Sequence, residues 1–199
     1  MIPTIVRTAL AALACALLAA PAAAGFKEGT LAYSHGDYAT ALKELEPLAA
    51  QGDASAQYLA GAALSNAKPP LQDFAQAEKW LRSAAAQGHL KAMVSLGNLF
   101  AFYAQPADYK QALEWFKMAA ERCDPEGEFM TGLGYFEGKT LEKDLPSAWM
   151  WLTLASLRGH LIAAVTQHEI TDRFSAADKA AGSERARQWR CQPQAGAPR

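Results

Sequence analysis

Apolar residues recur along the chain at steps of three and four, and each such run begins at an aspartate. The clearest run lies in residues 73–89, where one face of a helix would carry Ala77, Trp80, Leu81 and Ala84. Asp73 is a good N-cap, because its carboxylate accepts amide protons of the first turn. Gly88 suits the left-handed conformation that ends many helices. The pattern therefore predicts an amphipathic helix between these two residues.

The same pattern occurs four times in the chain. The aspartates that open it are separated by 36, 35 and 36 residues: Asp37, Asp73, Asp108 and Asp144. A tryptophan follows three of these aspartates at the same distance of seven residues: Trp80, Trp115 and Trp151. A period in this range indicates an array of helical repeats, and the many alanines and few β-branched residues favour helix throughout.

Another helix, of about three turns, is predicted before each of the last three runs, and it carries a glycine at a constant phase: Gly61, Gly97 or Gly132. Glycine costs about 1 kcal/mol inside a helix, so we expect two helices to approach closely at each of these points. His168 occupies the corresponding position near the C-terminus. Beyond it, Ser175 predicts the cap of a last helix, which ends near Trp189 and is highly charged, as a terminal unit facing water should be.

These residues resemble the Sel-1-like repeat family, a relative of the tetratricopeptide repeats. The resemblance rests on a small residue followed by Leu-Gly, then Asp-x-x-x-Ala, Trp and Ala-Ala-x-x-Gly-His, and the best copy joins Ala92–Phe100 to Asp108–Ala120. It covers about residues 26–190 and departs from the family pattern at Cys123, which replaces a turn glycine. It implies an all-α fold, a right-handed α/α solenoid of about four to five antiparallel helix pairs, and a role as a non-enzymatic scaffold or adaptor.

The two ends of the chain differ from the repeats. Residues 8–20 form a short apolar run after Arg7, and Pro21 and the small residues Ala22–Ala24 follow it. We interpret residues 1–24 as a secretory signal peptide, because the run is too short for a transmembrane anchor. The repeat domain would then occupy residues 25–190, and the tail of residues 191–199 is expected to be disordered. The expected location is the periplasm or the medium.

Removal of the leader leaves two cysteines, Cys123 and Cys191. An even number of cysteines in an exported chain is typical of a disulfide. The two residues lie in different repeats, however, and a bridge requires α-carbons within about 7 Å. A disulfide and two unpaired thiols therefore both remain open.

Composition and motifs give little support for chemistry. The formal net charge of −1 argues against binding to nucleic acid. The histidines do not form a metal-binding cluster in the sequence, and no cofactor is expected. Ser65 and Lys68 have the Ser-x-x-Lys spacing of penicillin-recognising enzymes, but the companion motifs are missing and Pro69 follows at once. On the Ser-x-x-Lys spacing alone, an enzyme of cell-wall or β-lactam chemistry is kept as an alternative interpretation. A structural assembly factor of an envelope complex is the other alternative.

The preferred function is binding of a protein or peptide on the concave face of the repeats. The outward face of each first helix is unusually apolar, and contiguous exposed apolar surface marks binding grooves. The partner-binding residues predicted on this face are Tyr58, Val94, Asn98, Phe102, Phe129 and Leu133. The alternative is that these residues bury one another or that the terminal helix covers them. The partner's identity and the oligomeric state do not follow from the sequence.

Overall fold

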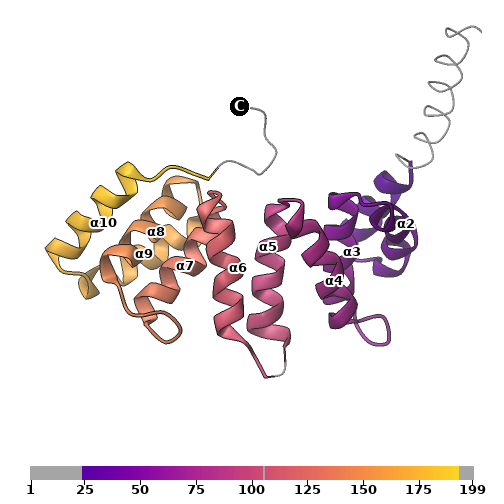
Figure 1. Ribbon diagram of the computed structural model, residues 1–199, viewed down its shortest axis with the longest axis horizontal. Helices are drawn as coiled ribbons and strands as arrows, with labels where there is room; N and C mark the ends of the chain where they lie inside the picture. Colours follow the sequence, from indigo (N-terminus) through magenta and orange to yellow (C-terminus); the bar gives the residue numbers. More distant parts are fainter. Residues whose placement is uncertain (1–23, 105, 193–199) are drawn as a thin grey trace, which may run out of the picture. The chain divides into compact units, whose positions relative to one another are not determined.

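The computed structural model describes residues 24–104 and 106–192 and is helical throughout, with no strand in those ranges. The chain runs as follows (Figure 1): helical residues 24–34, α2 Tyr38–Ala50, α3 Ala54–Asn66, α4 Phe74–Ala86, α5 Leu90–Asn98, the π-helical η1 Leu99–Tyr103, α6 Tyr109–Glu121, α7 Pro125–Glu137, α8 Leu145–Leu157, α9 Leu161–Glu169, the 3-10 turn η2 Thr171–Arg173 and α10 Ala176–Gln188. The predicted all-α class is confirmed. The predicted leader falls almost wholly outside the described residues.

The four predicted aspartate caps are confirmed. In each case the carboxylate accepts a hydrogen bond from the backbone amide three residues later, as at Asp73, whose Oδ1 lies 2.9 Å from the amide nitrogen of Gln76. Asp53 and Asp124 cap α3 and α7 in the same way. These caps satisfy amides that the first turn of a helix leaves without partners, and they fix where each helix begins.

The described chain forms two compact units, the first ending at Ala84 and the second beginning at Ala85. In the first unit, helical residues 24–34, α2, α3 and α4 pack in sequence, and Gly29 lies against the side chain of Leu45 on α2. In the second unit, α5 packs on α6, α6 on α7, α7 on α8 and α8 on α9. No helix in the described residues is both long and apolar enough to span a bilayer.

The close approach predicted at the repeated glycines is confirmed. A β-carbon on Gly97 would lie 2.5 Å from the ring of Phe116, one on Gly61 would lie 2.7 Å from Leu81, and one on Gly132 would lie 3.0 Å from Leu152. Each glycine therefore allows the larger side chain of the following helix to lie directly on the helix backbone.

We expect Gly97→Ala to lower the free energy of unfolding by about 2 kcal/mol, because overpacking outweighs the higher helix propensity of alanine. Urea denaturation measures the change. The double variant Gly97→Ala/Phe116→Leu should recover part of the loss, since the smaller side chain makes room. Equal losses in the two variants would contradict the close-contact explanation.

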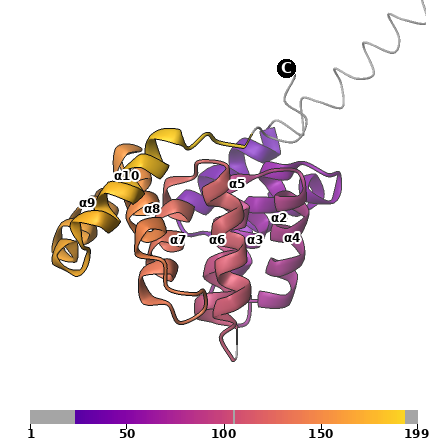
Figure 2. The same cartoon turned by 60° about the vertical axis from the view of Figure 1, so that its left-hand side comes forward.

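The last helix does not continue the stack. Ser175 caps α10 as predicted, in a capping box with Asp178, but α10 packs along α8 (Figures 1 and 2). At the contact, a β-carbon on Gly182 would lie 2.5 Å from the carbonyl oxygen of Pro146. The glycine needed for close packing is therefore on α10, whereas α9 carries the bulky His168 at the position where another helix would have to approach.

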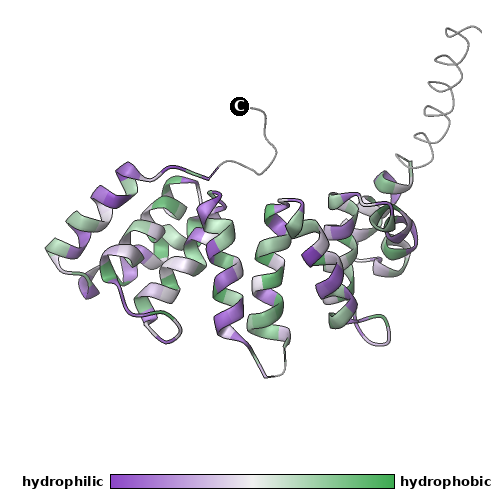
Figure 3. Cartoon of the chain, in the orientation of Figure 1, coloured by the Kyte–Doolittle hydropathy of each residue, from purple (hydrophilic) through white to green (hydrophobic). Residues whose placement is uncertain are grey.

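This arrangement leaves one side of α9 uncovered. Ala163 is the buried residue of that helix, and four large apolar side chains near it are more than half exposed: Leu157, Leu161, Ile162 and Val165. Conversely, α10 is the most polar helix and covers α8, the most apolar one (Figure 3). Shielding of α8 from water accounts for the return of α10 onto it.

Candidate functional site: an apolar groove between two repeats

A groove of about 360 Å³ lies in the second unit where α6 meets α7. Its walls come from η1, α6, α7 and the loop after α7: Ala101, Phe102, Tyr109, Leu113, Met130, Leu133, Gly134, Glu137, Lys139 and Thr140. The side chains of Phe102 and Tyr109 are 67% and 60% exposed. We call this set the α6–α7 groove. Aromatic rings left in water beside an apolar cleft are typical of surfaces that bind other proteins.

Local sequence explains the shape of the α6–α7 groove. Tyr109 follows the cap Asp108 and therefore stands on the first turn of α6, where it is half in solvent. Gly134 brings α7 close to α6, because a β-carbon there would lie 2.8 Å from Leu113 Cδ1. The π-helical turn η1 places Phe102 outward. The groove thus depends on one glycine and on the local geometry at two helix ends.

The polar groups of the α6–α7 groove lie at its rim. Lys139 Nζ lies 3.1 Å from the Glu137 carboxylate, and both side chains are at least half exposed. Such a surface ion pair contributes little to stability. Its two charges balance, so the groove offers apolar contact together with this ion pair and the hydroxyl groups of Tyr109 and Thr140. That combination suits recognition of a peptide rather than of a strongly charged ligand.

The predicted partner-binding residues differ in whether they line the α6–α7 groove. Phe102 and Leu133 line the α6–α7 groove. Val94 and Asn98 lie half-buried on α5 and do not line it. Phe129 differs from the prediction of an exposed wall: it is buried and stacks on the His160 ring at 4.7 Å.

Tyr58 belongs to the first unit, where it is half-buried. Burial raises the pKa of its phenol, and the neighbouring Tyr33 acts in the same direction. Tyr33 in turn accepts a hydrogen bond from Asn66 at 3.2 Å. Tyr58 is not among the residues that line the α6–α7 groove.

Sequence reasoning missed the contribution of α6 to the groove. Tyr109 and Leu113 of α6 were not predicted as binding residues, because the binding face was assigned to the first helix of each pair; Met130 lies on such a first helix, α7, and was missed there. The available signal was Gly134, a second glycine one half-turn after Gly132, which indicates a second close approach on the other side of α7.

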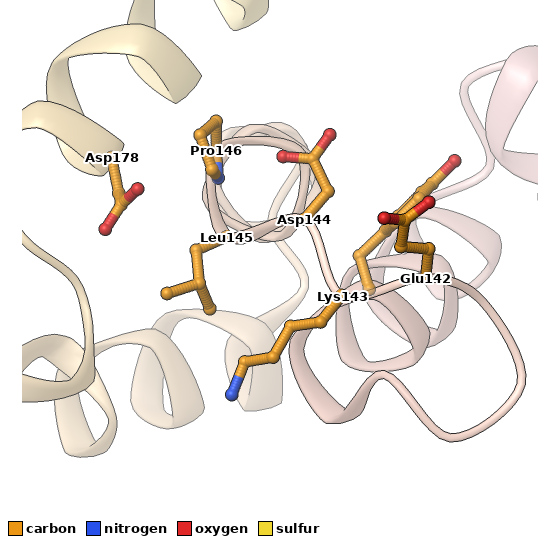
Figure 4. A pocket seen from close by; sticks show the side chains of 7 residues that line it. Glu142, Lys143, Asp144, Leu145, Pro146 and Asp178 are labelled. Carbon is orange, nitrogen blue, oxygen red and sulfur yellow. The ribbon is translucent and has the colours of Figure 1, made fainter.

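A second, polar pocket of about 540 Å³ lies near the start of α8. Figure 4 shows that Asp144 and Asp178 lie on opposite sides of Leu145 and that Lys143 extends away from the Asp144 carboxylate. Although burial acts to raise the pKa of Asp144, hydrogen bonds from Ser147 and the ion pair with Arg185 hold it below its usual value. The described residues contain no group of ligands arranged to hold a metal ion.

An ion pair in the second unit joins a buried carboxylate to a partly exposed cation. Glu128 on α7 is fully buried, and both of its carboxylate oxygens accept from Arg158 Nε, at 2.9 and 3.1 Å. Burial raises the pKa of Glu128 to about 6, and the hydrogen bond and charge of Arg158 oppose that rise. Arg158 is 34% exposed, so this cation links a buried carboxylate to the surface.

The two cysteines form a disulfide, with α-carbons 5.4 Å apart. Cys123 occupies the left-handed conformation that Gly52, Gly88 and Gly159 adopt in the other turns, so the turn keeps its shape without glycine. The expectation of a disordered tail from residue 191 is wrong for its first two residues. Cys191 is in the disulfide, and the Gln192 amide donates to the Glu121 carbonyl oxygen at 2.8 Å.

Ser65 and Lys68 are not brought together as a nucleophile and its base. The Ser65 side chain is buried, and its hydroxyl donates to the Gly61 carbonyl oxygen at 2.9 Å. Helix α3 ends at Asn66, and Lys68 lies exposed in the loop beyond it. His160 has a structural role, since its Nδ1 accepts from the Ala163 amide and caps α9.

Comparison with known proteins agrees with this architecture. Sel1 repeats match residues 54–89, 90–122 and 125–160, which together are more than half of the chain. An uncharacterized protein of Neisseria meningitidis serogroup B is 32% identical over 108 residues, which are 54% of this chain and 22% of that protein.

Two solved structures share the fold. A protective antigen of uropathogenic Escherichia coli that displays an SLR fold has a TM-score of 0.69 at 24% identity, over 82% of this chain and 38% of the antigen. A Sel1 repeat protein from Oxalobacter formigenes has a TM-score of 0.68 at 22% identity, over 84% of this chain and 70% of that protein. With its phased caps, its repeated packing glycines and these matches, the chain belongs to the Sel1 repeat family.

Proposed function

We propose that this chain is a protein-interaction scaffold that binds a peptide segment of its partner in the α6–α7 groove. Sel1 repeats generally mediate protein–protein contacts, and the observation that supports this particular site is the exposure of Phe102 and Tyr109 beside Leu133 and Met130. Burial of one large apolar side chain contributes about 1.5–3 kcal/mol. Three such side chains of a peptide would contribute about 4.5–9 kcal/mol, against the roughly 8 kcal/mol of a micromolar affinity.

We further propose that the protein works in the cell envelope. The apolar leader of residues 8–20 and the small residues Ala22–Ala24 support export. The Cys123–Cys191 disulfide supports an oxidising compartment, where such bonds form and persist.

Peptide display on the purified mature chain tests the groove. Peptides enriched on the wild type should carry apolar or aromatic anchor residues. Leu133→Asp should weaken their binding at least about tenfold, because it places a charge in the apolar wall. Calorimetry or fluorescence anisotropy measures the affinities, and circular dichroism confirms that the variants remain folded.

The matched control is Leu161→Asp. Leu161 is 80% exposed on α9, outside the α6–α7 groove, so the same change of charge there should leave peptide affinity within about twofold. Equal losses from both substitutions, or none from Leu133→Asp, would remove the groove as the binding site.

A further inference from the structure

The chain after α10 forms a short strap, residues 189–192, which the disulfide fixes to the turn after α6. Trp189 contacts Trp151 of α8 edge to face, with ring centroids 4.7 Å apart. Cys191 bonds to Cys123, and Gln192 donates from its amide to Glu121. The strap thus joins the turn after α6 to the surface of α8.

Beneath the strap lies an apolar cluster of the second helices. Ala120, Met150, Trp151 and Leu154 are buried there, and Trp189 packs against them. The noncovalent attachment is incomplete, since Trp189 Nε1 is buried and has no hydrogen-bond acceptor. A buried donor without an acceptor costs about 1–3 kcal/mol. The disulfide is the covalent part of this attachment.

The two sulfur atoms have different surroundings. Arg158 Nη2 lies 2.8 Å from Cys123 Sγ and 3.7 Å from Cys191 Sγ. Cys191 is exposed, whereas Cys123 is half-buried. A neighbouring cation stabilises a thiolate, and the sulfur with the more stable thiolate leaves faster in thiol–disulfide exchange. The exposure of Cys191 and the Arg158 charge beside Cys123 therefore both favour attack on Cys191 with Cys123 as the leaving group.

We propose that the Cys123–Cys191 disulfide is an exchange site for an external dithiol protein, with Cys191 the sulfur attacked and Cys123 the leaving group. A thiolate of the dithiol bonds to Cys191 Sγ, the S–S bond breaks, and its electron pair goes to Cys123, which leaves as a thiolate beside Arg158. The second thiol of the dithiol then loses its proton and attacks the dithiol sulfur that is bonded to Cys191. This step releases Cys191 as a thiolate. The dithiol is oxidised to a disulfide and the chain gains two electrons and two protons.

Opening of the bond frees the strap and uncovers Trp151 and its neighbours. The groove between α6 and α7 takes no part in this reaction, so the proposal is independent of the partner-binding function. The redox state of the chain would control access to the apolar surface of α8. A structural disulfide would instead resist reduction as long as the protein stays folded.

Brief reaction of the full mature chain with reduced glutathione identifies the attacked sulfur. After an acid quench, free thiols are alkylated with N-ethylmaleimide and the peptides are analysed by mass spectrometry. We expect glutathione on Cys191 and maleimide on Cys123, in about tenfold excess over the opposite pattern. Equal amounts, glutathione mainly on Cys123, or no reaction without denaturant would each overturn the proposal.

The role of Arg158 is tested in a background that leaves no buried carboxylate unpaired. Glu128→Gln/Arg158→Gln should react with dithiothreitol about tenfold more slowly than Glu128→Gln alone, because the Cys123 thiolate loses its cation. A loosened fold would increase the rate instead, so the two effects have opposite signs. Equal or faster reaction of the double variant overturns the assignment of the leaving group.

Acrylamide quenching of tryptophan fluorescence reports release of the strap. Quenching should increase when the wild type is reduced, and the Cys123→Ser/Cys191→Ser variant should match the reduced form. Trp151→Phe and Trp189→Phe should each remove part of the increase, because release of the strap separates these two packed rings and exposes both of them. Unchanged quenching after reduction, with both thiols free, would show that the strap stays in place and would refute its release.

Discussion

Arg158→Met is expected to lower the free energy of unfolding by about 3 kcal/mol at pH 7.5. The reason is the fully buried Glu128 carboxylate, which would lose its cation while remaining out of water. Removal of one partner of a buried pair typically costs 3–5 kcal/mol. We expect the lower end, since Arg158 itself is partly in solvent and its own desolvation is small. Urea denaturation followed by circular dichroism measures the loss.

The effect should depend on pH in a defined direction. The pKa of Glu128 is raised to about 6, so the folded chain binds this proton more tightly than the unfolded chain does. Its contribution to stability is complete below about pH 4.5 and is lost as pH rises through about 6, by roughly 2 kcal/mol. The deficit of Arg158→Met should therefore shrink to less than about 1 kcal/mol at pH 5, where Glu128 is protonated.

Glu128→Gln is the control for this pH dependence. The amide keeps the shape of the side chain and carries no charge, so it should flatten the stability profile between pH 4.5 and 7. The double variant Glu128→Gln/Arg158→Met should be more stable at pH 7.5 than Arg158→Met alone. A pH-independent deficit in Arg158→Met would show that the loss comes from packing of the arginine stem instead.

The regular part of the fold was predictable because its signals repeat. Asp37, Asp73, Asp108 and Asp144 cap their helices as the spacing predicts, and side-chain caps depend only on the next three residues. The packing glycines were recognisable for a similar reason. Glycine destabilises a helix, so its recurrence at the same position of each repeat indicates that the next helix approaches closely there each time. Local rules thus determine the helix pairs.

The exceptions to the repeat were harder to predict, because they depend on contacts between distant segments. Glu128 and Thr131 occupy the phase where the preceding repeat has Met93 and Leu96, and both are fully buried. That change from apolar to polar was visible in the sequence, but the partner of Glu128 lies 30 residues further on. The sequence pattern alone does not reveal such a pair.

The groove and the end of the chain were predicted in part. Phe102 and Leu133 were identified from the apolar face of the first helices, whereas Tyr109 and Leu113 belong to the following second helix. Likewise the helix after Ser175 was predicted, but its packing on α8 was not. Trp149 is half-buried for the same reason, since its indole donates to Ser183 of α10 at 3.1 Å. In both cases the missing information was which helix lies against which.

Trp151→Ala is expected to lower the free energy of unfolding by about 4 kcal/mol, whereas Trp115→Ala should cost about half as much. Both tryptophans hold the same position in successive repeats, but Trp151 is only 4% exposed and Trp115 is half-buried. Truncation of a fully buried tryptophan removes its contacts and leaves a cavity, at about 3–5 kcal/mol. The strap and α10 cause the difference, because Trp189 covers Trp151. Equal losses in the two variants would contradict the role assigned to this cover.

A double-mutant cycle between Trp151 and Trp189 isolates that role. If Trp189 stabilises the chain by packing on Trp151, then Trp189→Ala should cost about 1 kcal/mol less in the Trp151→Ala background than in the wild type. The corresponding cycle between Trp115 and Trp189 should be additive within about 0.5 kcal/mol. Coupling at Trp151 but not at Trp115 would assign the extra stability of the last repeat to the segment that follows α10. Since the disulfide positions this segment, the coupling should also fall when the cysteines are reduced.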